Sequence, residues 1–205
     1  FRKREILNHP NHKMKNKFLT GLATLGVAVL FLSSCEEVPQ VEADAATAAV
    51  NEAKASGADT YVSESYVALS DSLKSVMAEI EAENSKFFKK FGPQKEKLVK
   101  ITQQAAVVKQ ASETRKAEIK TQVAALAEEV KALIETGRQL AAVAPKGKEG
   151  AAAVDAIKEE LTVVETTIGE ASAQAEKGEL MPALDKVKAA KEKATSINTE
   201  LQTVI

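Results

Sequence analysis

The sequence contains one cysteine, two histidines and no tryptophan among its 205 residues. Both histidines, His9 and His12, precede Met14, and the cysteine is Cys35. Beyond Cys35 the chain therefore lacks the side chains needed for Ser-His-Asp or Cys-His nucleophiles, for zinc sites of cysteine and histidine, and for haem ligation by either residue. A disulfide within the chain is excluded as well, because it needs two cysteines. Only carboxylate, lysine, tyrosine and hydroxyl chemistry is left, so we expect no enzyme and no cofactor.

Aromatic residues and net positive charge are also scarce. Stacking platforms for bases or sugars are hard to build from so few rings, because only five aromatic side chains follow Cys35: Tyr61, Tyr66, Phe87, Phe88 and Phe91. Residues 35–205 carry 22 lysine and arginine residues against 28 aspartate and glutamate residues, a net charge of −6. Binding to phosphates requires a basic face, so nucleic acid is not an expected partner.

The stretch 14–35, MKNKFLTGLATLGVAVLFLSSC, has the order of an export signal. Lys15 and Lys17 provide a short positive start. The apolar run that follows, 18–32, has fifteen residues and is shorter than a membrane-spanning helix requires. The residues before Met14 do not fit a signal start, and we interpret them as upstream translation.

The end of this stretch, Leu32-Ser33-Ser34-Cys35, resembles the lipobox of bacterial lipoproteins. The resemblance implies that signal peptidase recognises Leu32, Ser33 and Ser34, that the chain is cleaved before Cys35, and that a covalent diacylglyceryl lipid is attached to the Cys35 sulfur. The expected organisation is residues 1–13 outside the protein, a signal peptide over 14–34, a lipidated tether over 35–40 and a helical bundle over 41–205.

The membrane that receives this lipid is the first expected partner. Enteric lipoproteins with aspartate directly after the lipidated cysteine stay in the inner membrane, and this chain has Glu36 there. The resemblance therefore favours the outer membrane, with the protein facing the periplasm. An acidic start also resembles the surface-export signals of some Bacteroidota, so exposure on the cell surface stays open.

Beyond the tether, apolar residues recur at the three- and four-residue spacing of amphipathic helices, and no strand-like alternation occurs. The predicted fold class is all-α, an elongated antiparallel helical bundle with coiled-coil-like packing. The longest predicted helix covers about 94–143 and would be about 75 Å long. Halfway along this helix, Ser112 and Arg115 occupy positions where the pattern calls for apolar residues. At Ile119 the pattern contains an extra four-residue step, which is called a stutter.

The lengths of the segments suggest how they are arranged. Segment 41–91, with a break at Gly57, is predicted to remain helical through Phe91, to turn at Gly92-Pro93 and to lie antiparallel to 94–143. Segments 150–177 and 181–204 either form a hairpin against one half of the long helix or continue as one kinked helix. Their KGELMPAL corner resembles the helix-turn-helix corner of tetratricopeptide repeats, which favours the hairpin. The apolar stripes of these helices could pack against one another within one chain or between chains, so the sequence does not decide whether the protein forms oligomers.

A second resemblance concerns the start of the helical region. The stretch Ala55-Ser-Gly-Ala-Asp-Thr-Tyr61, followed by Tyr66, Leu69 and Leu73, resembles the alanine-rich helical domain of a group of uncharacterised bacterial envelope lipoproteins. The similar part covers about residues 45–75. The resemblance implies an envelope helical bundle of unknown function.

The aromatic cluster Phe87-Phe88-Lys89-Lys90-Phe91 is the candidate binding patch. Phe88, Lys89 and Lys90 could contact a partner protein or a bilayer surface. Alternatively, the cluster could close the corner of the bundle with Phe87 and Phe91 in the core, and helical spacing favours this interpretation.

Charged clusters elsewhere suggest solvated helix faces. Adjacent glutamates such as Glu128-Glu129 point about 100° apart on a helix and do not converge on a metal or a substrate. The last helix is rich in lysine, but Asp185 and Glu192 interrupt the run. We therefore predict no metal site. The leading hypothesis is a non-enzymatic structural, scaffolding or protein-binding lipoprotein of the cell envelope, with another envelope protein as partner; the alternative is an amphipathic-helix binder of lipid or another apolar ligand.

Overall fold

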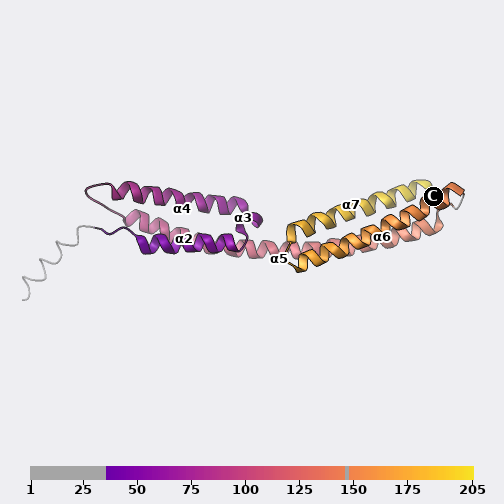
Figure 1. Cartoon of the computed structure of the whole chain (residues 1–205), viewed down its shortest axis with the longest axis horizontal. Helices are drawn as coiled ribbons and strands as arrows, with labels where there is room; N and C mark the ends of the chain where they lie inside the picture. Colours follow the sequence, from indigo (N-terminus) through magenta and orange to yellow (C-terminus); the bar gives the residue numbers. More distant parts are fainter. Residues whose placement is uncertain (1–35, 146–147) are drawn as a thin grey trace, which may run out of the picture.

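The computed structural model describes residues 36–145 and 148–205 (Figure 1). The predicted signal peptide and the lipobox residues Leu32, Ser33, Ser34 and Cys35 lie outside this part. The described chain is helical and contains no strand, which confirms the all-α prediction. Its helices are α2 (Gln40–Ala55), α3 (Ala58–Tyr61), α4 (Ser63–Asn84), α5 (Gly92–Val143), α6 (Lys148–Glu176) and α7 (Leu180–Val204).

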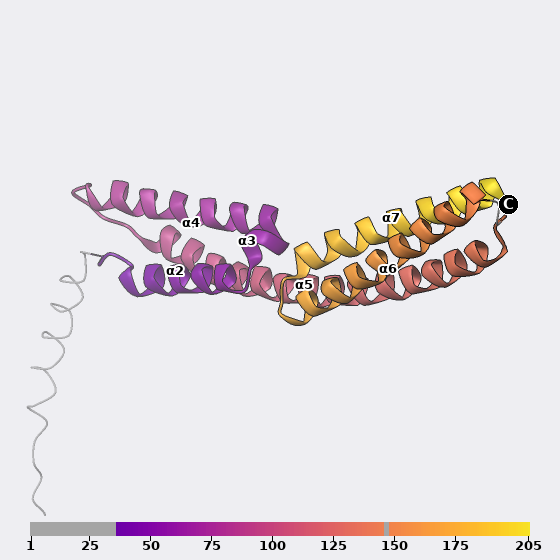
Figure 2. The same ribbon diagram turned by 45° about the vertical axis from the view of Figure 1, so that its right-hand side comes forward.

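Helix α5 is the spine of the molecule (Figures 1 and 2). Its first half packs with α2 and α4 around one hydrophobic core, which includes Leu98 and Ile101. Its second half packs with α6 and α7 around a separate core, which includes Val130 and Leu161. The predicted long helix is confirmed: α5 has 52 residues, which corresponds to about 78 Å. We call the two units the first bundle and the second bundle.

In the first bundle, α4 and α2 run in opposite directions along α5. Lys97 near the start of α5 bonds to Glu79 near the end of α4, at 2.6 Å, so this pair is antiparallel. Lys109, farther along α5, bonds to Glu52 near the end of α2, at 2.9 Å, so α2 is parallel to α5. The prediction that the whole of segment 41–91 lies antiparallel to α5 is therefore wrong for α2.

The reason is that the chain reverses at Gly57, between α2 and α3. Gly57 has a φ of +83°, in the left-handed region that glycine adopts without strain. The Ser112 hydroxyl of α5, which is fully buried, donates to the carbonyl of Ser56 at 2.9 Å and thereby satisfies a carbonyl at the end of α2. Short helix α3 follows, and the half-buried Tyr61 at its end packs against the core of the second bundle.

Helix α4 ends at Asn84 and not at Phe91 as predicted. Residues 85–91 form a seven-residue loop, and α5 begins at Gly92 with Pro93 in its first turn. Phe91 is fully buried in the first core, as predicted, but it enters that core from the loop. Phe87 is 91% exposed, so the prediction that it belongs to the core is wrong. Helical spacing no longer applies to Phe87, because α4 has already ended at Asn84.

The C-terminal segments form the predicted hairpin and not one kinked helix. Helix α6 ends at Glu176, and Gly178 follows with a φ of +87°. The Gly178 N–H donates to the Ala175 carbonyl, and the Glu179 N–H donates to the Gln174 carbonyl, which is the Schellman pattern. Lys186 of α7 then pairs with Glu170 of α6 across the hairpin, at 2.8 Å.

The two turn glycines provide a matched pair of substitutions. Gly57→Ala and Gly178→Ala each place a side chain at positive φ, which costs about 1–2 kcal/mol. At Gly57 the added Cβ would also lie 3.0 Å from two ring carbons of Tyr61, whereas at Gly178 nothing lies within 4 Å. We expect Gly57→Ala to lower the free energy of unfolding more than Gly178→Ala does, in urea titrations followed by circular dichroism. Equal losses would show that the Tyr61 contact does not constrain the turn.

Candidate functional site

The loop between α4 and α5 lies at the same end of the molecule as the start of the described chain (Figures 1 and 2). The Phe91 N–H donates to Oε2 of Glu36 at 2.7 Å. Oε1 of Glu36 lies 4.0 Å from Nζ of Lys95 in the first turn of α5. Glu36, the first residue that the structure describes, and this loop therefore lie at the same end of the rod. We call residues 85–91 the tip loop.

Hydrogen bonds hold the tip loop in one shape. Glu83, in the last turn of α4, accepts from the Lys90 N–H at 3.0 Å and from Lys86 Nζ at 2.6 Å. Lys89 Nζ donates to Oδ1 of Asn84 at 2.7 Å. The buried ring of Phe91 closes the other end of the loop. The loop is thus fixed to the helix before it and to the core after it.

This shape presents two aromatic rings to solvent. Phe87 is 91% exposed and Phe88 is 75% exposed, and their rings meet edge to face with centroids 5.0 Å apart. The predicted patch of Phe88, Lys89 and Lys90 lies in this loop, and the structure adds Phe87 to it. Asn84-Ser85, a pair that disfavours helix, was the signal in the sequence that could have revealed the end of α4.

Glu83 is the titratable group on which the loop's bonds converge. The hydrogen bond from the Lys86 ammonium and then the bond from the Lys90 N–H lower the pKa of Glu83 below its ordinary value of 4.5. A lowered pKa means that these bonds stabilise the loop above the ordinary glutamate pKa. The stabilisation is lost as the pH falls through the lowered pKa of Glu83.

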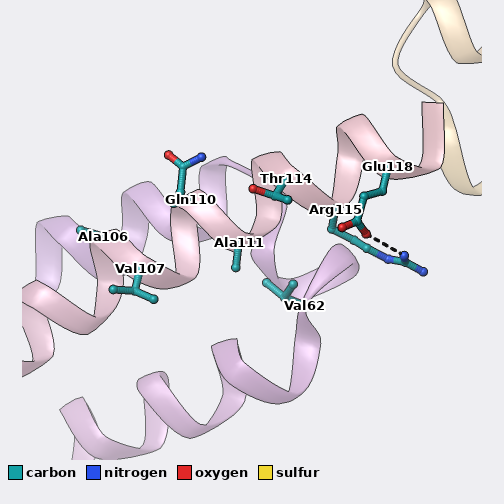
Figure 3. A pocket seen from close by; sticks show the side chains of 8 residues that line it. All are labelled: Val62, Ala106, Val107, Gln110, Ala111, Thr114, Arg115 and Glu118. Carbon is teal, nitrogen blue, oxygen red and sulfur yellow. Dashed lines mark hydrogen bonds and ion pairs between the residues drawn. The ribbon is translucent and has the colours of Figure 1, made fainter. Parts of the chain in front are cut away.

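A second feature is an open groove of about 700 Å³ where α5 leaves the first bundle (Figure 3). Arg115 and Glu118 bond to each other at 3.1 Å at one end, so they are not directed at a ligand. Val62 faces Ala111 across the groove (Figure 3). Apart from this ion pair, the only polar side chains in the lining are those of Gln110 and Thr114, and both are neutral. The lining therefore brings no set of charged groups together. The groove is lined by Val62, Ala106, Val107, Gln110, Ala111, Thr114, Arg115 and Glu118.

The charged faces of the second bundle include several ion pairs between helices. Lys193 bonds to Glu160 at 2.8 Å, and this bond raises the pKa of Lys193 above its ordinary value. Lys191 bonds to Glu129 of α5. Within residues 36–145 and 148–205, no group of three or more histidine, cysteine, aspartate or glutamate side chains could hold a metal ion.

Comparison with known proteins identifies one relationship. Residues 25–144 match the model of a family described as "Predicted periplasmic lipoprotein (DUF2291)". The matched range includes the lipobox residues, the first bundle and all of α5, whereas α6 and α7 lie beyond it. No curated protein and no solved structure matches the chain. None of the helices in the described ranges combines the length and apolar character that spanning a bilayer requires.

The bonds of Glu83 predict a pH-dependent tip loop. Lowering the pH through the lowered pKa of Glu83 should reduce the protection factor of the Lys90 amide in hydrogen-exchange NMR, because the carboxylate that accepts from it becomes protonated. In Glu83→Gln the protection should be weaker at neutral pH and nearly independent of pH, since the amide keeps an acceptor but has no charge. The control is Glu81→Gln, at an exposed neighbouring position. An unchanged pH profile in Glu83→Gln would contradict the assignment.

Proposed function

This chain belongs to the family of predicted periplasmic lipoproteins, DUF2291, and from that premise we propose that it is a lipid-anchored, non-enzymatic spacer. In this proposal the lipid on Cys35 holds the tip-loop end at the membrane. The second bundle is held away from the bilayer, where another envelope protein binds it.

The observation that carries the proposal is the unbroken helix α5. It connects the end next to Glu36 to the far end of the second bundle over 52 residues, or about 78 Å. A single helix that belongs to both bundles transmits position and orientation from one end to the other. A compact enzyme domain has no need of this geometry, whereas a spacer depends on it.

The sides of the rod support an upright orientation. Ion pairs between helices line both bundles, such as Lys97–Glu79 in the first and Arg138–Glu165 in the second. A helix that lies flat on a membrane needs a continuous apolar face along its length. The large apolar side chains exposed along the described helices are spaced apart, as Val99, Val107 and Val143 on α5 illustrate.

Binding of a lipid or another apolar ligand between the helices has less support. The apolar stripes of the described helices face one another in the two cores, and these cores contain many alanines at close helix contacts. A ligand would therefore have to separate helices that already bury their apolar faces. The groove of Figure 3 has a mostly apolar lining, but it is open to solvent and does not enclose a ligand as a cavity would.

We further propose that the lipid resides in the outer membrane, which the glutamate at position 36 supports. Labelling cells with palmitate and separating the two membranes by density should give a labelled chain in the outer-membrane fraction and no label in Cys35→Ser. Label in the inner-membrane fraction would reject the outer-membrane location but would leave the lipid anchor in place. Absence of label from the unsubstituted chain would reject the anchor.

The upright orientation can be measured by energy transfer to the membrane surface. Glu96 and Val143 are exposed positions near opposite ends of α5. They are separated by roughly 70 Å along the helix.

Single cysteines at these positions can be labelled selectively, because the native cysteine carries the lipid in this proposal. With the lipidated chain in vesicles that contain an acceptor on the headgroups, we expect strong transfer from Glu96→Cys and weak transfer from Val143→Cys. Equal transfer from both would mean that the rod lies flat, and would reject the spacer.

A further inference from the structure

We propose that the tip loop is a second membrane contact, in which Phe87 and Phe88 insert into the interfacial region of the bilayer that holds the Cys35 lipid. This inference rests on the lipid anchor of the proposed function and adds a role that the anchor alone does not supply. The lipid attaches the chain, and the tip loop sets the orientation of the rod on the surface.

Position is the first argument. Glu36, one residue after the predicted lipid site, accepts the Phe91 N–H at 2.7 Å and lies 4.0 Å from Lys95. The loop is therefore bonded to Glu36, the first residue after the proposed membrane anchor. Pro39, three residues further, is fully buried, so the tether merges into the first bundle almost at once. Four residues, 36–39, are too few to carry the tip far from the bilayer.

The chemistry of the loop suits a phospholipid surface. Aromatic rings are favoured at the boundary between headgroups and acyl chains, where part of the ring is removed from water. The two exposed phenylalanines are flanked by lysines, whose stems can follow apolar surface while the ammonium groups contact phosphates. Residues 83–95 contain four lysines, Lys86, Lys89, Lys90 and Lys95, against one acid, Glu83. Glu36 and Glu37 offset part of this charge, so the phenylalanines supply the main attraction.

The shape of the loop is prepared before binding. The bonds from the backbone N–H groups of Lys86 and Lys90 to Glu83, together with the buried ring of Phe91, restrain the backbone on both sides of the exposed pair. A preorganised contact loses less conformational entropy on insertion than a flexible loop would. Phe87 and Phe88 also leave the core intact when they insert, because neither ring contributes to it.

The absence of tryptophan from the sequence allows a direct test. Phe88→Trp places one fluorophore in the tip loop, and Val163→Trp places one at a 64% exposed position of the second bundle. Both full-length chains are produced with their lipid and reconstituted in vesicles of phosphatidylethanolamine and phosphatidylglycerol, with and without brominated acyl chains. We expect emission from Phe88→Trp to shift to shorter wavelength and to be quenched by the brominated lipid. Emission from Val163→Trp should do neither.

The controls separate this inference from the proposed function. Flotation with the vesicles reports the lipid anchor, and circular dichroism reports the fold of each variant. If the chains float but Phe88→Trp keeps a solvent-like, unquenched emission, the tip loop does not enter the bilayer and the inference is wrong, while the spacer stands. If neither chain floats, the anchor fails and the spacer fails with it. A blue shift without quenching would indicate contact with protein and would also overturn the bilayer contact.

Discussion

The structure depends on one junction, at which α5 passes from the first bundle to the second. Ser112 is fully buried there, and its hydroxyl bonds to the Ser56 carbonyl at the end of α2. A buried hydroxyl with a partner costs little, and it removes the cost of burying that carbonyl alone. Gly57 then reverses the chain, and Tyr61 packs against the second core. The two cores are thereby connected through one helix that belongs to both.

This junction explains why the molecule is a rod. Each core is only three helices thick, and α5 is the element that they share. Packing within each bundle stabilises one half of α5, and Ser112 and Tyr61 add contacts where the two halves meet. Lys116 adds to this by lying 5.6 Å above the ring of Tyr61. A tip that docks on a surface can therefore set the direction of the far end.

Glu36 illustrates how one residue can have two interpretations. In the sequence it is the residue after the predicted lipidated cysteine, where its identity bears on membrane sorting. In the structure it accepts the Phe91 N–H and neighbours Lys95. The second role gives a physical reason for a carboxylate at this position that is independent of sorting. It also joins the tether to the tip loop, which no local pattern in the sequence indicates.

Much of the helical architecture could be predicted from spacing alone. The stripe Leu98, Ile101, Ala105 and Val108 is buried as expected, and Gly178 ends a helix as its position suggested. In the second half of α5 the buried residues do not keep to one stripe: Val130 is buried, Leu126 is only half-buried, and Ala127 beside Leu126 is buried. The reason is that α6 and α7 cover a face wider than one stripe. A period in the sequence identifies a buried face, but it does not identify how many neighbours cover that face.

The sequence by itself determined the helical class, the long central helix, the predicted lipid site and the lack of cysteine and histidine chemistry beyond Cys35, because these depend on composition and on local periodicity. Only the tertiary structure decided that α2 runs parallel to α5, that α4 stops at Asn84 and that Phe87 points to solvent. These features depend on the Ser112–Ser56 bond and on the contacts of Glu83 and Glu36, whose partners are distant in sequence or lie in a loop. Local patterns carry no information about such partners, because the free energy that selects them arises only when the segments meet.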